Sequence, residues 1–305
     1  MTRFFFEMDR RNFRLSGIRL MCQASLAFSL MVVAVKFATS TLPALEVVFF
    51  RSLLGSLMLA FLMIRKRVPF AGKPKQRKFL LARGIFGFLA LTLHFYTISL
   101  LPLGTAVILN YLSIIFVALL ASIFIGERPG VFLISVTLIS FAGVYLLVGA
   151  NARIEPGQEL PVFLGILSAV FAAVAVLGIR MVGHRESPLT VIFYFTGISM
   201  VGSFFYLPFG FRWPNGYEAF ALAVIAIGSF YGQLWATIAY RRAPASLVAP
   251  FAYITPLLAF LYGLVFWQEK ITLGKILGAL LISVGGISIS FSESQRGKKL
   301  PLEPA

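Results

Sequence analysis

The chain contains 305 residues, of which 59% are hydrophobic and 12% are charged, and its mean hydropathy is +0.91. Soluble proteins carry about a quarter charged residues, so this composition excludes an ordinary soluble domain. The net charge of +16 is concentrated in the gaps between apolar runs, a distribution that is typical of topology-setting charges and argues against nucleic-acid binding.

Ten apolar runs follow one another along the chain, and each approaches the roughly 20 residues that a helix needs to cross the hydrocarbon layer. Because backbone polar groups must be satisfied inside lipid, we expect an all-α integral membrane protein with ten transmembrane helices. The first run is too long for the core of a signal peptide, and no cleavage site follows it. The expected spans are residues 16–38, 43–64, 79–100, 103–125, 130–149, 162–182, 188–209, 217–239, 244–267 and 272–291.

A polar linker over 151–161 divides the spans into two sets of five. We expect an N-terminal segment over 1–15, one five-helix repeat over 16–150, a second over 162–291 and a tail over 292–305. If the N-terminus is cytoplasmic, the inner segments carry twenty Lys and Arg residues and the outer gaps carry three. The positive-inside rule therefore predicts a multi-pass protein of the cytoplasmic (inner) membrane with both termini in the cytoplasm, as an even number of spans requires.

The two halves repeat at a constant shift of 142 residues, without a gap across two whole spans. Since each half has an odd number of spans, the second half must enter the membrane upside down. An inverted repeat of this kind is typical of transporters with a binding site at the midplane and alternating access. The residues that coincide are Pro102 with Pro244, Tyr111 with Tyr253, Glu127 with Glu269, and Gly143 with Gly285.

Glu127 and Glu269 each end one span and precede the next. A carboxylate in this position faces the positive end of the following helix and stabilises it. We interpret both acids, together with Pro102 and Pro244, as structural residues at helix corners. A role of either acid in proton coupling is the alternative.

The repeat resembles the drug/metabolite transporter superfamily, EamA type. The segments that carry the resemblance are "FFRSLLGSLML", "FYTISLLPLGTAVIL" and "AYRRAPASLVAPFAYITPLLAFLYGLVFWQEK". The resemblance implies a central cavity lined by the first, third, fourth, sixth, eighth and ninth spans. The second copy departs from the family pattern because Gln268 stands before Glu269 where Gly is common. In addition, Phe195 stands opposite Arg51 in the repeat, so the two halves differ chemically.

Charged side chains inside a span are costly and are functional candidates by default. Arg51 lies about eight residues into the second span, and Glu46, five residues earlier, is expected to pair with it in part. Arg51 therefore has two interpretations, packing and pairing or ligand binding. Arg83 lies near the inner edge of the third span, where snorkelling to the interface explains it.

The third span carries Arg83, Gly87, Ala90 and His94 at spacings of 4, 3 and 4, which places them on one helix face. Asn110 enters the fourth span at a depth comparable to that of His94. The two side chains are expected to converge on one side of a cavity. They form either a buried hydrogen-bonded pair or a site for ligand binding or proton transfer, since histidine titrates near neutral pH.

The remaining cavity candidates come from the eighth, ninth and first spans. Gln233 and Trp235 belong to "FYGQLW". In this segment Tyr231, Gln233 and Trp235 are two residues apart, so they cannot all lie on the same helix face. Tyr253 and Thr255 lie between two prolines that interrupt the ninth span. From the first span we select Gln23, with the neighbouring Ser25 as the alternative.

A GxxxG pattern at Gly274 and Gly278 predicts close helix packing, either within the chain or in a homodimer. No catalytic motif, nucleotide-binding loop or metal-ligand spacing occurs, so we expect neither an enzyme nor a bound cofactor or metal. The excess of basic over acidic groups inside the spans favours an anionic or zwitterionic metabolite. The sequence thus predicts a secondary transporter for a small polar metabolite, surrounded by lipid. A non-transporting scaffold or sensor on the same fold, or an intramembrane enzyme, is the alternative.

Overall fold

A computed structural model describes residues 2–39, 41–101, 103–126, 129–148, 157–205, 207–267 and 272–296. All regular secondary structure in these ranges is helical. Pro102, Glu127 and Glu269, the proposed corner residues, lie outside the described residues, whereas Pro244 lies between two helices.

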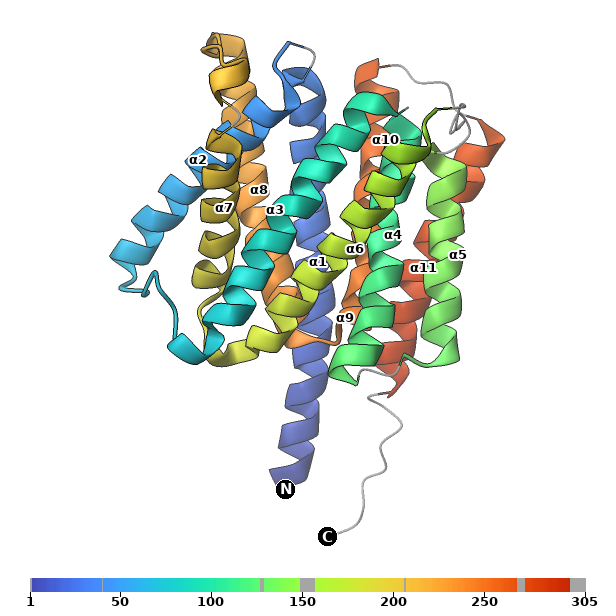
Figure 1. Cartoon of the computed structure of the whole chain (residues 1–305). Helices are drawn as coiled ribbons and strands as arrows, with labels where there is room; N and C mark the ends of the chain where they lie inside the picture. The colour runs from blue at the N-terminus through green and yellow to red at the C-terminus, as the bar shows by residue number, and fades with distance from the viewer. Residues whose placement is uncertain are drawn as a thin grey trace.

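The helices match the expected spans in number and order within the described ranges. The long helices are α1 (Thr2–Ala38), α2 (Ala44–Arg65), α3 (Arg77–Leu100), α4 (Leu103–Ile125), α5 (Val131–Val148), α6 (Glu159–Val182), α7 (Pro188–Phe204), α8 (Gly216–Arg242), α10 (Ile254–Trp267) and α11 (Leu273–Arg296). Helix α1 begins and α11 ends at the same end of the bundle (Figure 1). The prediction of ten crossing segments is therefore confirmed.

The ninth span is broken, as its prolines predict. It consists of a short helix, α9 (Ala245–Val248), a 3-10 turn, η5 (Ala249–Tyr253), and α10. Pro250 lies inside the 3-10 turn and Pro256 lies in the first turn of α10. A proline removes a backbone donor and disfavours a continuous α-helix, so the break lies beside the polar residues Tyr253 and Thr255.

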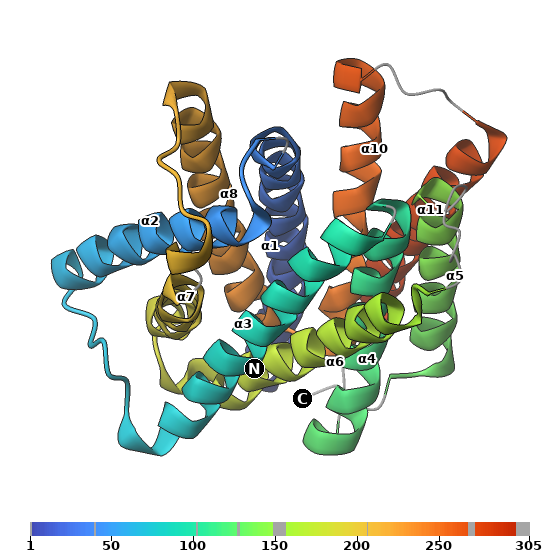
Figure 2. The same cartoon turned by 45° about the horizontal axis from the view of Figure 1, so that its top comes forward.

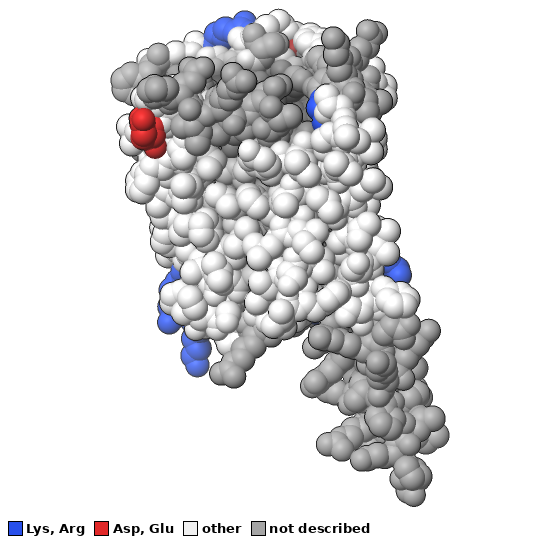
Figure 3. All heavy atoms as spheres, turned by 90° about the vertical axis from the view of Figure 1, so that its right-hand side faces the viewer, with Lys and Arg blue, Asp and Glu red and all other residues white. Residues whose placement is uncertain are grey.

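The surface agrees with a membrane environment. Five helices in the described ranges are long and apolar enough to span a bilayer by length and composition. On the face that α5 and α11 share, Ile134, Leu138, Val284 and Ile287 are exposed. Figure 3 shows this face with described Lys, Arg, Asp and Glu residues near its two ends and a broad band between them that carries none. This is the pattern of a multi-pass membrane protein.

The contact between α5 and α11 reveals a pseudo-two-fold axis. A Cβ atom added to Gly143 would lie 2.8 Å from the carbonyl oxygen of Gly278 and 3.0 Å from Ile282 Cγ1. A Cβ atom added to Gly285 would collide with Ser140 Oγ and lie 3.3 Å from Val136 Cγ1. Val136 and Ser140 are the repeat equivalents of Gly278 and Ile282, at the same shift of 142 residues. The two helices therefore make the same contact in both directions.

Other equivalent residues also meet across this axis. The rings of Tyr111 and Tyr253 lie 5.7 Å apart. The guanidinium carbon of Arg51 lies 5.7 Å from the centre of the ring of Phe195, which aligns with Arg51 at a shift of 144 rather than 142 residues. Inverted repeats bring equivalent residues together in this way when their pseudo-two-fold axis lies in the membrane plane.

The two repeats interlock. The most extensive helix pairs are α1 with α8, α3 with α6, α5 with α11, α4 with α6 and α2 with α7, and every one of them joins one repeat to the other. Figure 2 shows α2, α7 and α8 on one side of the bundle and α4, α5, α10 and α11 on the other. Packing within the chain also explains the GxxxG pattern, because Gly278 approaches Gly143, and a Cβ atom added to Gly274 would lie 3.7 Å from the carbonyl oxygen of Leu146.

Candidate functional site

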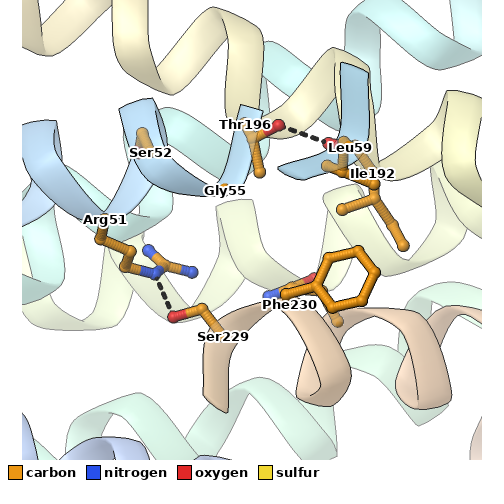
Figure 4. Close-up of a pocket in the computed structure, with 9 residues that line it drawn as sticks. Arg51, Ser52, Gly55, Leu59, Ile192, Thr196, Ser229 and Phe230 are labelled. Carbon is orange, nitrogen blue, oxygen red and sulfur yellow. Dashed lines mark hydrogen bonds between the residues drawn. The ribbon is translucent and has the colours of Figure 1, made fainter. Parts of the chain in front are cut away.

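Arg51 lies inside the bundle, with only 6% of its surface exposed. Its Nε atom donates a hydrogen bond of 2.7 Å to Ser229 Oγ on α8. Ser229 in turn lies 3.0 Å from the sulfur of Met31. Figure 4 shows the two terminal nitrogens of Arg51 directed into a pocket between α2, α7 and α8. They form no hydrogen bond to the described residues.

Arg83 is buried to the same extent, so the snorkelling interpretation is wrong. Its Nη2 atom donates a hydrogen bond of 2.9 Å to Gln233 Oε1, and its Nε atom has no partner among the described residues. Gly87, one turn further along α3, makes room for this arrangement, because a Cβ atom there would collide with Arg83 Nη1 and lie 2.7 Å from the Phe195 ring. The small residue therefore accommodates an arginine of its own helix.

The two arginines share one aromatic ring. The guanidinium carbon of Arg83 lies 4.3 Å from the centre of the Phe195 ring, and that of Arg51 lies 5.7 Å from it. These two distances to one ring centre place the guanidinium carbons at most about 10 Å apart, so the like charges repel by at least about 1.7 kcal/mol at an effective dielectric constant of about 20. The ring offers cation–π attraction to both charges but neutralises neither. Among the described residues, no carboxylate forms a salt bridge with either arginine.

Glu46 does not pair with Arg51 as expected. It is fully buried, and its Oε1 atom accepts a hydrogen bond of 3.0 Å from the backbone N–H of Arg212. The Arg212 side chain binds Glu218 and donates a hydrogen bond of 3.0 Å to the carbonyl oxygen of Thr41. The acid is therefore engaged near the start of α2, one and a half helical turns from Arg51.

The pocket at Arg51 is small. Arg51 and Gly55 of α2, Thr196 of α7, and Ser229 and Gln233 of α8 are among its lining residues. The space open to the centre of a water molecule is about 10 Å³, roughly what one water requires. The pocket accommodates one small group, and a whole metabolite does not fit.

A second polar cluster surrounds the break in the ninth span. Tyr253 is fully buried, and its hydroxyl has no partner among the described residues. Thr255 donates a hydrogen bond of 3.3 Å to the carbonyl oxygen of Ser25, and the Ser25 hydroxyl donates one of 3.1 Å to the carbonyl oxygen of Phe251. These bonds connect α1 to the broken helix. Two predicted candidates, Tyr253 and Thr255, thus lie at the pseudo-two-fold axis beside Tyr111.

The other predicted residues are dispersed. His94 on α3 and Asn110 on α4 are both half-buried, and their convergence stays a prediction. Gln23 is exposed, whereas its neighbour Ser25 is buried, which favours Ser25 as the inward residue of α1. Trp235 is half-buried, and its ring lies 5.3 Å from that of Tyr231. Gln233 contacts Arg83 and Trp235 contacts Tyr231, as the spacing of two predicts.

The arginine cluster consists of Arg51, Arg83, Phe195, Ser229 and Gln233. Sequence reasoning missed three of these residues, namely Arg83, Phe195 and Ser229. Two signals were present. Phe195 aligns with Arg51 in the repeat, and Ser229 precedes Gln233 by four residues, which places both on one face of α8. An inverted repeat brings equivalent helices together, so these positions were candidates for contact.

Comparisons with known proteins agree with this fold. The EamA-like transporter family matches residues 15–149 and 160–291. The pseudopaline exporter CntI of Pseudomonas aeruginosa (strain UCBPP-PA14) is 34% identical over 283 residues, which cover 90% of this chain and 96% of that protein. Solute carrier family 35 member G1 of Mus musculus is 25% identical, over 84% of this chain and 73% of its own length.

A solved crystal structure superposes with a TM-score of 0.79 at 20% sequence identity, and the match covers 92% of this chain and 98% of that one. At this identity the superposition supports the fold alone. The family and the named relatives are transporters rather than enzymes. The chain is therefore a multi-pass membrane protein that belongs to the EamA-like transporter family.

Proposed function

We propose that this protein moves a small anionic or zwitterionic metabolite across the cytoplasmic membrane. The proposed negative charge on the substrate rests on two buried arginines, Arg51 and Arg83. Neither has an acidic partner among the described residues. Each charge inside a span costs about 2.5–3.5 kcal/mol on insertion scales. A site that retains two such charges without neutralising them is suited to an anionic group and repels organic cations.

Relatives whose names state a substrate support a metabolite as cargo. One is named a pseudopaline exporter, and another, from Rickettsia bellii, is named an S-adenosylmethionine uptake transporter and is 24% identical over 87% of this chain. These names include both directions of transport. The proposal for this chain is accordingly a metabolite transporter that functions as an exporter or an importer.

The proposed mechanism is alternating access around a midplane cavity. Helices of the two repeats pair with each other throughout the bundle, so the bodies that move contain helices of both repeats. We infer that such bodies meet at the break between α9 and α10 and at the pseudo-two-fold contact of Tyr111 with Tyr253. We propose His94, Asn110, Tyr253 and Thr255 as substrate-contacting residues. Gln233 and Trp235 are in supporting positions, and Ser25 replaces the exposed Gln23 on α1.

The proposed topology has both termini in the cytoplasm, with the polar linker at 151–161 outside. The five-helix units over 16–150 and 162–291 are joined by this linker and flanked by the segments 1–15 and 292–305. Their charge distribution follows the positive-inside rule. Fusing a periplasm-active and a cytoplasm-active reporter in turn to the C-terminus tests this topology, and activity of the periplasmic reporter would contradict it.

The experiment for the function is a thermal-shift screen of detergent-purified protein against a library of metabolites. A compound that binds the folded state raises the unfolding temperature with its concentration. We expect anionic or zwitterionic compounds to stabilise the wild type and to lose their effect in His94→Ala and Asn110→Ala. Each hit is then tested for transport in proteoliposomes. Stabilisation by quaternary ammonium compounds alone would refute the proposed substrate class, and equal shifts in all three proteins would refute the proposed site.

A further inference from the structure

In the arginine cluster, some hydrogen-bond donors of Arg51 and Arg83 have no acceptor among the described residues. Arg51 Nε is occupied by Ser229, and Arg83 Nη2 is occupied by Gln233. Arg83 Nε is buried without a partner, and the terminal nitrogens of Arg51 form no hydrogen bond to the described residues. Buried polar groups are hydrogen-bonded in the great majority of cases, and each exception requires an explanation such as an ion.

The charge balance is incomplete in the same place. Two guanidinium groups lie over one phenylalanine ring, and neither meets a carboxylate in the described part of the chain. The nearby acceptors, the Ser229 hydroxyl and the Gln233 amide, are neutral. Guanidinium groups bind carboxylates and phosphates through forked hydrogen bonds, so the missing component is a negative charge.

The volume of the pocket limits the size of the anion that can bind there. It is lined by Arg51, Thr196, Ser229 and Gln233, and its open volume matches about one water molecule. A chloride ion is of this order of size, and a carboxylate would place one oxygen there. A phosphate group with several oxygens exceeds the space.

We propose that Arg51 and Arg83 form a binding site for one small anion, either chloride or the carboxylate of a transported metabolite. Arg51 contacts the anion through its terminal nitrogens, and Arg83 supplies the second positive charge through its position on the Phe195 ring. Gln233 links the two, because it lines the pocket and accepts the hydrogen bond from Arg83. The carboxylate source rests on the proposed function, whereas the chloride source does not.

The test uses full-length protein purified in detergent with sodium methanesulfonate as the only salt. Sodium chloride or sodium formate replaces it stepwise up to about 100 mM at constant ionic strength, and the unfolding temperature is recorded. We expect a saturable rise of roughly 5 °C in the wild type. Equilibrium binding of radioactive chloride measures the stoichiometry, for which we expect one ion per chain. An unchanged unfolding temperature together with no bound chloride and no formate effect would overturn the proposal and leave an ordered water in the pocket.

Three variants locate the effect. Gln233→Glu places a carboxylate at the cluster, so we expect its unfolding temperature without chloride to equal or exceed that of the wild type and its anion response to disappear. Arg51→Lys keeps the charge and loses the forked donors, and we expect its anion affinity to fall at least tenfold. Arg65→Gln, at the exposed end of the same helix, is the matched control and retains the full response. A Gln233→Glu response equal to that of the wild type refutes the site.

Competition experiments distinguish chloride from a metabolite carboxylate as the bound anion. They also test the anion site separately from the proposed transport function. If saturating chloride abolishes stabilisation by a carboxylate metabolite, the carboxylate group of the metabolite occupies the pocket. If the two effects add, chloride is resident and the metabolite binds elsewhere. A normal chloride response with no metabolite binding or transport would refute the proposed function and leave the anion site intact. Metabolite transport without any anion response would do the reverse.

Discussion

Replacing Gly143 by alanine tests whether the contact between α5 and α11 holds the two repeats together. The added Cβ atom would lie 2.8 Å from the carbonyl oxygen of Gly278, 3.0 Å from Ile282 Cγ1 and 3.0 Å from Leu281 Cβ. Ordinary contacts of this kind begin near 3.4 Å. Because a backbone carbonyl cannot rotate away as a side chain can, the helices must separate by several tenths of an ångström.

The cost of this separation can be estimated from core overpacking, which is typically about 1–3 kcal/mol. Alanine also favours a helix over glycine by about 1 kcal/mol, which offsets part of the loss. The matched control is Gly197→Ala in the middle of α7, where no atom lies within 4 Å of the added Cβ. The propensity gain is the same at both sites, so the difference between the two variants isolates the packing cost of about 1–3 kcal/mol.

The assay is unfolding in detergent, followed by helical circular dichroism during titration with sodium dodecyl sulfate. We expect Gly197→Ala to be as stable as the wild type or up to about 1 kcal/mol more stable, and Gly143→Ala to be less stable than this control by the packing cost. If Gly143→Ala is as stable as Gly197→Ala, the close approach of α5 to α11 is not a determinant of the fold.

Four further substitutions test other contacts in the structure. Gly285→Ala is expected to destabilise the protein, because the Cβ atom added at residue 285 collides with Ser140 Oγ. Combining it with Ser140→Ala should restore most of the lost stability. A double variant no more stable than Gly285→Ala alone would contradict this. Asn215→Ala removes the side chain that caps α8 by accepting a hydrogen bond from the Glu218 N–H, so unfolding measurements should show a loss of about 1 kcal/mol that Asn215→Asp avoids. Thr255→Val removes the hydrogen bond to the carbonyl oxygen of Ser25 and should lower the stability by about 1 kcal/mol. Tyr253→Phe removes a hydroxyl that has no partner among the described residues, so it should change the stability by less than about 0.5 kcal/mol. A larger loss for Tyr253→Phe would show that its hydroxyl is engaged.

Hydrophobicity and the repeat were sufficient to predict the spans, because apolar length and internal symmetry are properties of the sequence itself. The prolines of "APFAYITP" likewise predicted the broken ninth helix. The partners of single charges were not predictable in this way. Glu46 was assigned to Arg51 because the two are close in sequence, but the chain folds a loop residue, Arg212, onto it from 166 positions away. Local spacing determines which face of a helix a residue occupies, whereas its partner depends on how distant helices pack.

Arg83 illustrates the same limit at the candidate site. Its place near the end of an expected span favoured an exposed side chain, whereas its burial follows from the packing of α3 against α6 and α7 and from its hydrogen bond to α8. Gly87 leaves space on α3, Phe195 of α7 fills part of it, and Gln233 of α8 accepts the hydrogen bond. No single helix carries this information, since each contributes one component of the arginine's environment.

Along the pseudo-two-fold axis, some equivalent residues are identical and support the fold, whereas one pair differs in charge. Where α5 meets α11, the equivalent residues are Gly143 and Gly285, and at the broken helix they are Tyr111 and Tyr253, so the contacts on the two sides match. Where α2 meets α7, the equivalents are Arg51 and Phe195, and the match is lost. A symmetric scaffold requires only that the backbones fit, which identical small or aromatic residues achieve. An asymmetric charge gains nothing for that fit and costs free energy inside a membrane. We therefore propose that, at the position where the symmetry fails, a ligand rather than the fold accounts for the residue.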